Sequence, residues 1–124
     1  MKREFSLKGR NSFKEVYQKG KRYQKQGIQL IVLHTEALEF ASEKKPEKQF
    51  VVKMGISVSR RYGKAHDRNK IKRQIKAIWS DSLKNMQSGF YIIIRPGESA
   101  KLLSYSEKKD VLQELLKRAK VLSI

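Results

Sequence analysis

The sequence contains no cysteine among its 124 residues. Disulfide bonds and thiolate metal sites are therefore excluded. No apolar run approaches the roughly 20 residues that span a bilayer, and the charged N-terminus is not followed by the apolar segment of a secretory signal. These absences favour a cytoplasmic protein without membrane attachment.

Acidic residues are also scarce. Twelve Asp and Glu stand against 29 Lys and Arg, which gives a formal net charge of +17. The excess lies in two blocks, because residues 1–26 have nine basic and two acidic side chains and residues 53–76 have nine and one, whereas residues 27–52 have three and four. Such an uneven positive surface attracts polyanions and favours a shaped site for nucleic acid over a uniformly charged coat.

Residue patterns that support catalysis are missing. The two histidines, His34 and His66, have no cysteine or paired acid nearby with which to form a metal cluster. No Ser-His-Asp spacing, phosphate-loop lysine motif or pair of catalytic carboxylates occurs. Asp67 is isolated among cations and suits helix capping or a salt bridge. We therefore predict no catalytic residue, no metal site and no cofactor bound by the chain itself; His34 is expected to be a structural or surface residue and His66 to be able to contact phosphate.

The length predicts a single domain over residues 1–124, of which 1–10 form a loosely held basic arm. Hydrophobic periodicity predicts the elements that follow. These are helices over 12–19, 65–85 and 106–121 and strands over 28–34, 50–59 and 90–94, with a possible further strand at 38–40, a basic connector at 21–25 and a solvated loop at 42–49. The order α-β-β(-β)-α-β-α predicts an α+β fold, an α/β sandwich with a small mixed sheet.

Capping-box patterns open the first and the last of these helices. They consist of Ser12 with Glu15 and of Ser104 with Glu107. Gly20 is a suitable residue to end the first helix, because glycine is favoured just after a helix.

Two aromatic residues, Phe13 and Tyr17, lie four positions apart on one face of the first predicted helix. Two interpretations stay open. The rings are core residues, or they stack on unpaired bases, as aromatic side chains do in proteins that bind single strands.

The strand over 50–59 alternates between two kinds of side chain. One face is apolar and packs a core; it holds Phe50, Val52, Met54, Ile56 and Val58. The other face is too small and polar to be buried under helices, so we expect it to stay open to a ligand; it holds Val51, Lys53, Gly55, Ser57 and Ser59.

The helix over 65–85 has an apolar stripe and a basic face. The stripe consists of Ile71, Ile75, Ile78, Trp79 and Leu83. The polar face is contiguous and holds Asn69, Lys72, Arg73 and Lys76. Such a face is either solvated or a binding surface, and the near absence of acids favours binding because the cations repel one another until a polyanion arrives. The start of this helix, beside Gly63-Lys64-Ala65, adds free N–H groups for phosphate oxygens.

The segment from Gly55 to Arg73 reads Gly-Ile-Ser-Val-Ser-Arg-Arg-Tyr-Gly-Lys-Ala-His-Asp-Arg-Asn-Lys-Ile-Lys-Arg. With this motif the chain resembles the protein subunit of bacterial ribonuclease P. The resemblance extends to the first helix and to residues 91–95, which are similar to the family's last strand, and so covers nearly the whole chain. It implies a left-handed βαβ crossover of the ribosomal-protein-S5-domain-2-like type, an exception to the usual right-handed rule.

The resemblance also implies a function. The family's protein is a non-catalytic partner of a catalytic RNA, which with Mg²⁺ removes the 5′ leader from precursor tRNA by hydrolysis. The implied partners are this RNA and precursor tRNA, with no obligate protein partner and no membrane.

Position in the family's motif implies the site residues. Those expected to contact RNA are Arg60, Arg61, Lys64, Arg68, Asn69, Lys70, Lys72 and Arg73, and the polar face of the helix adds Lys76. Those expected to lie along the leader are Phe13, Tyr17, Lys53 and Ser57. The third motif position is Lys70 where the family has Arg, which keeps the charge but loses the planar fork for bidentate phosphate contacts.

Two other classes of protein fit the sequence less well. A ribosomal-protein-like RNA binder would explain charge and size, but not an open sheet face beside an aromatic helix. A self-sufficient nuclease would need clustered carboxylates for metal ions, and the acids here are scattered.

Overall fold

The computed structural model describes residue 7 and residues 10–34, 52–87 and 89–122. The elements in this part of the chain are α1 (Arg10–Lys19), β1 (Lys21–Lys25), β2 (Ile28–His34), β3 (Val52–Ile56), α3 (Ala65–Ser82), β4 (Phe90–Pro96) and α4 (Tyr105–Arg118). Short 3-10 turns occur at Arg60–Tyr62, Leu83–Asn85 and Glu98–Leu102. The predicted α+β class is confirmed, whereas the possible strand at 38–40 and the loop at 42–49 lie outside the described residues.

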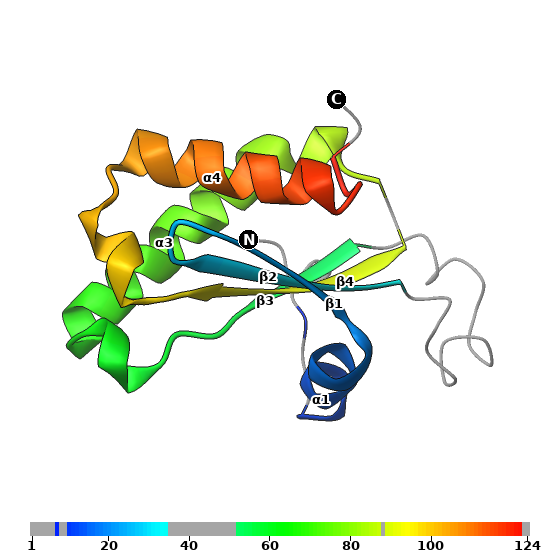
Figure 1. The fold of residues 1–124 in the computed structure, drawn as a ribbon, viewed down its shortest axis with the longest axis horizontal. Coiled ribbons are helices and arrows are strands. Elements are labelled where there is room, and N and C mark those ends of the chain that lie inside the picture. Colours follow the sequence, from blue (N-terminus) through cyan, green and yellow to red (C-terminus); the bar gives the residue numbers. More distant parts are fainter. Residues whose placement is uncertain (1–6, 8–9, 35–51, 88, 123–124) are drawn as a thin grey trace.

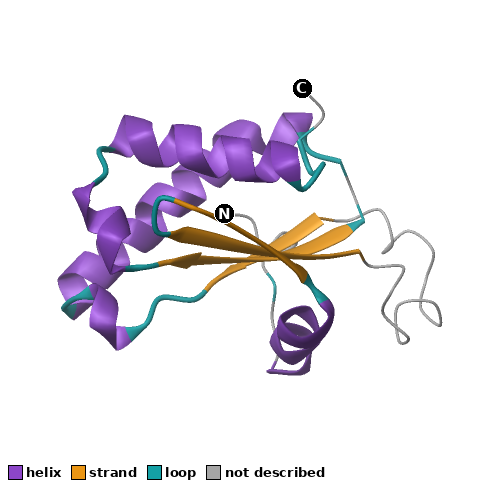
Figure 2. Ribbon diagram, in the orientation of Figure 1, coloured by secondary structure: helices purple, strands orange, loops and turns teal. Residues whose placement is uncertain are grey.

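The four strands form one mixed sheet in the order β1-β2-β4-β3. The first two pairs in this order are antiparallel, and β3 and β4 are parallel. Parallel neighbours need a crossover connection, which α3 supplies here. The fold has three layers, with α3 and α4 on one face of the sheet and α1 on the other (Figure 1; Figure 2).

The basic connector predicted at 21–25 is wrong, because these residues form the edge strand β1. β1 pairs with β2 through a two-residue turn, in which Gln26 and Gly27 have φ angles of 46° and 84°. Two left-handed residues are the conformation that matches the twist of a tight hairpin. The strand lacks apolar alternation because only Tyr23 packs against the main core, while the exposed positions hold the polar residues Lys21, Arg22 and Gln24. Charged residues are common on edge strands.

The main core lies between the sheet and the α3/α4 layer. Ile71, Ile75, Ile78 and Trp79 are each no more than 1% exposed, and Leu83 is partly buried against them. The predicted stripe of this helix is therefore confirmed. These side chains pack against one face of the sheet and so hold α3 in a fixed orientation.

A smaller second core lies on the opposite face of the sheet, under α1. Its buried members are Leu7, Val16, Ile31, Leu33 and Ile93. Leu7 is also tied to the sheet through its N–H, which donates to the carbonyl of Met54 over 3.0 Å. Of the predicted arm 1–10, this residue is therefore held in place, and residue 10 already begins α1.

The capping box predicted for the last helix is confirmed, with α4 beginning after Ser104. The Ser104 hydroxyl accepts from the N–H of Glu107 over 3.1 Å, and the Glu107 carboxylate accepts from the N–H of Ser104 over 2.8 Å. The hydrogen bond from the Ser104 N–H to the carboxylate, followed by a contribution from the Ser104 side chain, favours the charged form and lowers the pKa of Glu107. The side chain of Ser12, which begins the other predicted box, lies outside the described side chains.

Replacing Ser104 with Ala should lower the free energy of unfolding by about 1 kcal/mol, because a backbone donor loses its acceptor. Urea denaturation at pH 7 measures this, with Ser106→Ala as a control that leaves the box intact. A group whose folded-state pKa is lowered stabilises the fold above its unfolded-state pKa, and this stabilisation is lost as the pH falls through the folded-state value. Because Ser104→Ala keeps the backbone N–H that donates to the carboxylate, both proteins should lose most of this stabilisation in acid. Equal stability of the two at pH 7 would contradict the assignment.

Candidate nucleic-acid interface

The turn before α3 is anchored by one buried ring. Tyr62 is 3% exposed, and burial, together with the nearby charge of Asp67, raises its pKa. Arg60 and Arg61 precede it in the same 3-10 turn, and both side chains are exposed. Lys64, at the N-cap of α3, is exposed as well. A rigid aromatic anchor therefore presents a group of cations at the start of the helix.

The polar face of α3 is accessible, as predicted. Asn69, Arg73 and Lys76 are exposed, and Lys72 is half-buried. Among the described residues, none of these cations has a carboxylate within ion-pair distance. Their charges are thus available to an anionic partner.

Arg68 differs from the other cations of α3 because it is only partly exposed. Its Nε is buried and has no hydrogen-bond partner within the described residues. A buried donor without an acceptor costs free energy, and this cost is recovered when an acceptor arrives. A phosphate oxygen would supply such an acceptor.

Lys70 lies on a different side of α3 from Lys72 and Lys76. It lines a hollow toward α4 together with Gln74 and Lys108. The Lys108 ammonium donates to the side-chain carbonyl of Gln74 over 2.9 Å, and burial, followed by repulsion from Lys70, lowers the pKa of Lys108. The structure therefore does not bring this motif position together with the rest of the basic face.

A groove joins α1, β3 and the basic side of α3. Phe13 and Gly55 line it together with Lys72 and Lys76, and its volume is about 240 Å³. The Phe13 ring lies directly on the backbone of β3, since a Cβ added at Gly55 would be 2.4 Å from the ring's Cζ. Glycine is required at this close approach. The groove therefore places an aromatic ring beside two ammonium groups.

A second, more polar hollow continues along the same face of the sheet. Ser57, which directly follows β3, lines it together with Gln24, Gln29 and Arg95. The volume of this hollow is about 250 Å³. Tyr17 lies next to it, with its ring centroid 5.6 Å from the guanidinium carbon of Arg95. These distances allow cation–π contact.

The face predicted to stay open is only partly open. α1 covers the middle of it, so that Gly55 is buried under Phe13 while Lys53 and Ser57 stay half-exposed; position 51 lies outside the described residues. The rings of Phe13 and Tyr17 are half-buried against the second core. Each ring packs on the second core and also keeps an exposed portion. The core interpretation is therefore confirmed in part, and stacking on unpaired bases stays a prediction.

Sequence reasoning missed several residues of this face. Tyr91 lies beside Lys53 in the sheet register, and burial raises its pKa. Tyr91 and Arg95 are the residues of β4 that are not buried, and they are an even number of positions apart. Because successive side chains of a strand point to opposite faces, the sequence could have placed both on the same face of the sheet. Arg22 and Gln24 were missed because β1 was not recognised as a strand.

The residues described here contain no group of three or more His, Cys, Asp or Glu placed to hold a metal ion. The three helices of the described chain are each too short or too polar to cross a membrane. What this face offers a ligand is therefore cations, amides and aromatic rings.

Comparisons with known proteins show which family the sequence is similar to. The sequence profile described as Ribonuclease P matches residues 1–120. The ribonuclease P protein component of Pseudanabaena sp. (strain PCC 6903) is 32% identical over 117 residues, which cover 94% of this chain and 91% of that protein. That of Picosynechococcus sp. is 32% identical over 120 residues, which cover 96% and 93%.

Solved structures share the fold. The RNase P protein of Staphylococcus aureus superposes with a TM-score of 0.79 at 24% identity and covers 96% of this chain and 98% of its own. The RNase P protein from Thermotoga maritima gives a TM-score of 0.75 at 24% identity, with 91% and 96% covered. The three-layer arrangement is therefore that of these proteins.

Proposed function

The chain belongs to the ribonuclease P protein family, and from this membership we propose that it is the non-catalytic subunit of a ribonucleoprotein whose RNA cleaves precursor tRNA. In this proposal the basic side of α3 binds the catalytic RNA, and the groove under α1 holds the single-stranded 5′ leader. We assign the Mg²⁺-dependent hydrolysis to the RNA.

The cations of α3 support the contact with the catalytic RNA. Arg73 and Lys76 are exposed without ion-pair partners in the described chain, and Arg68 carries an unpaired donor. Each phosphate that such a residue neutralises releases counterions, which favours association at moderate salt. A rigid helix, fixed by the buried stripe behind it, can present these cations without further ordering.

The observation that carries the leader assignment is the groove in which Phe13 lies on Gly55 beside Lys72 and Lys76. A single strand exposes base faces and phosphates at once, and proteins hold it through aromatic stacking combined with cations. Along the same sheet face, Ser57 and Arg95 supply hydrogen-bond partners further on. These contacts need no particular base sequence.

This placement would give the subunit a defined effect on the reaction. Contacts with the leader exist in the precursor and are lost once the leader has been removed. They therefore favour substrate over product and do not hold the mature tRNA on the enzyme.

Two measurements test this function. Protein freed of RNA should not cleave precursor tRNA in Mg²⁺, and added catalytic RNA should restore specific 5′ cleavage. The affinity of the reconstituted enzyme should rise as the leader is lengthened over its first nucleotides and then level off, because the groove has a finite length. Cleavage by RNA-free protein, or an affinity that ignores leader length, would refute the proposal.

A further inference from the structure

A second groove lies on the other face of the sheet, between the C-terminal end of α4 and strands β1 and β2. Its volume is about 520 Å³. The floor is apolar and nearly buried, and consists of Val32, Phe90 and Ala119. The walls carry two rings, Tyr23 and the exposed His34, whose ring centroid is 4.4 Å from that of Phe90. The sheet separates this groove from the one under α1.

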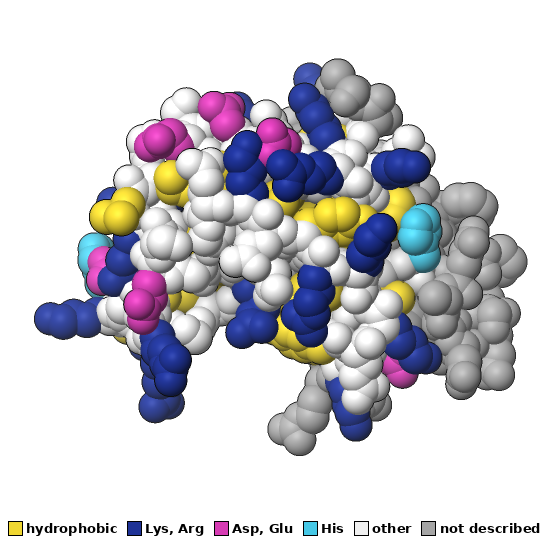
Figure 3. Space-filling model, in the orientation of Figure 1, with side chains coloured by type: hydrophobic (Ala, Val, Ile, Leu, Met, Phe, Trp, Pro, Cys, Tyr) yellow, Lys and Arg dark blue, Asp and Glu magenta, His cyan; other side chains and the backbone are white. Residues whose placement is uncertain are grey.

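The rim of this groove is cationic. Lys21, Arg118 and Lys120 line it, and no Asp or Glu does so within the described chain. Figure 3 shows the result as a strip of hydrophobic surface between α4 and the edge strand, with Lys and Arg side chains along its borders. An apolar floor inside a ring of positive charge fits a flat ligand that carries negative charge.

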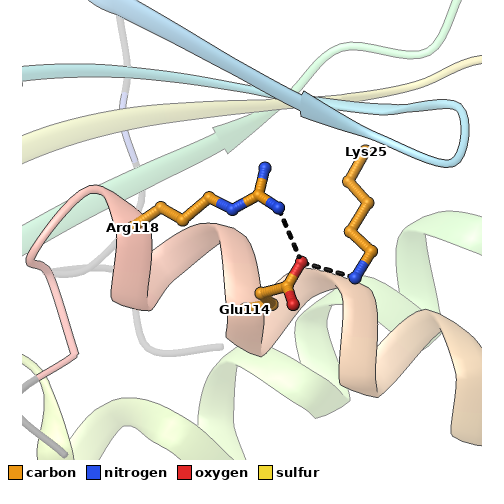
Figure 4. A network of polar contacts seen from close by, with 3 residues as sticks. All are labelled: Lys25, Glu114 and Arg118. Atoms are coloured by element: carbon orange, nitrogen blue, oxygen red, sulfur yellow. Dashed lines mark ion pairs between the residues drawn. The ribbon is translucent and has the colours of Figure 1, made fainter.

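Arg118 is held beside this groove by an ion-pair network. Its guanidinium Nη2 is 3.1 Å from a carboxylate oxygen of Glu114, and the same oxygen pairs with the Lys25 ammonium (Figure 4). Lys21 and Lys120 have no ion-pair partner in the described residues; the Lys21 ammonium lies 5.7 Å from the Tyr23 ring centroid. Two rim charges are therefore uncompensated.

The backbone at Lys120 supplies an independent observation. Its N–H donates to the carbonyl of Lys117 over 3.0 Å, and the N–H of Val121 donates to that of Leu116 over 2.9 Å, which is the Schellman arrangement at a helix end. Lys120 occupies the position where glycine is usual, with a left-handed φ of 61°. A strained non-glycine residue that persists at the rim of a groove points to a role for its side chain.

We propose that this groove binds one unpaired nucleotide of an RNA strand, at a site distinct from the leader groove. The base lies on the apolar floor between Tyr23 and His34, and the phosphates contact Lys21 and Lys120. Gln87, whose side chain also lines the groove, lies in reach of a base edge. The inference rests on the RNA-binding role proposed above but uses residues that are absent from the leader path.

The test uses a short RNA with a photoreactive base. A hexanucleotide that contains 4-thiouridine is irradiated with the full-length protein, and the adducts are mapped by mass spectrometry. Adducts are expected on Tyr23 and His34, in addition to any on α1. Phe13→Ala should reduce only the α1 adducts, so that a failure of leader binding and a failure of this site can be told apart.

Matched variants control for the loss of positive charge and for unfolding. Lys21→Gln combined with Lys120→Gly should reduce the adducts at Tyr23 by about 10-fold or more at 0.1 M salt, because two phosphate contacts are lost and each contributes roughly 0.7 to the salt slope of a single strand. The glycine should at the same time raise the melting temperature. Lys84→Gln combined with Lys117→Gln removes the same charge from exposed positions outside the groove and should leave these adducts unchanged. Because the groove variant gains stability while losing RNA, unfolding cannot produce the expected result.

Three outcomes would overturn the proposal. They are the absence of adducts at Tyr23 and His34, an equal loss in the groove and control variants, and competition by hexaglutamate as effective as that by unlabelled RNA. The last would show that only charge is recognised.

Discussion

The variant in which Gln replaces Lys72, Arg73 and Lys76 should bind the catalytic RNA roughly two to three orders of magnitude more weakly at 0.1 M salt. Each lost phosphate contact lowers the slope of log K against log salt by roughly 0.7–0.9. Three lost contacts therefore lower it by roughly 2–3, and the difference accumulates over the tenfold range between 1 M salt, where the electrostatic contribution is small, and 0.1 M.

The fold should survive this change, because Arg73 and Lys76 are exposed and none of the three side chains belongs to a core cluster. Filter binding over a salt series gives both affinity and slope, and circular dichroism checks the fold. Gln at Lys84, Lys109 and Lys117 removes the same charge from other surfaces. If the control variant shows an equal loss of affinity and an equal decrease in salt dependence, RNA binding depends only on the total positive charge of the protein. The basic side of α3 would then not be a specific contact.

Phe13→Ala combined with Tyr17→Ala should remove most of the preference for precursor over mature tRNA in the reconstituted enzyme. A base stacked on an aromatic ring is worth about 1–3 kcal/mol, so the affinity ratio should fall roughly 5- to 150-fold for each base lost. Binding of mature tRNA should hardly change, because it has no leader. Both rings are half-buried, so the loss of stability should stay below the roughly 3–5 kcal/mol that a fully buried ring contributes.

Tyr105→Ala is the matched control, since Tyr105 is 40% exposed at the start of α4, away from the groove. Gly55→Ala offers an independent route, because its Cβ would displace the Phe13 ring without removing it. Affinity ratios and melting curves are measured on the same samples. If the double variant is folded and its ratio of affinities for precursor and mature tRNA is unchanged, the assignment of the groove to the leader is contradicted.

The elements with strong local signals were predictable from the sequence. β2 runs over the predicted residues 28–34, and α3 begins at the predicted residue 65 with its stripe buried. β1 was not predictable from the alternation of apolar and polar residues. Tyr23 is the one residue of this edge strand that packs against the main core, so the strand shows no such alternation. The Gln-Gly pair at its end was the available signal.

The residues of the candidate site could be predicted within single helices and strands, but the contacts between these elements could not. Helical spacing grouped Lys72, Arg73 and Lys76 correctly, but the side on which Lys70 lies depends on where α4 docks, which local pattern does not encode. The contact of Phe13 with Gly55 joins two segments far apart in the chain and required the tertiary structure. The RNA and leader roles came from resemblance to a family, because charge alone is shared by many RNA-binding proteins.

The unequal size of the two cores has a consequence for motion. Of the described residues, five buried side chains form the second core between α1 and the sheet, against 21 in the main core. Segments with few buried contacts open locally at a small fraction of the global unfolding free energy. We therefore expect α1 to open locally more readily than α3 and the sheet, and such an opening would carry Phe13 away from Gly55. Under the proposed function, a leader strand bound in the groove would favour the closed state by mass action, so that substrate binding would itself complete the closing of α1.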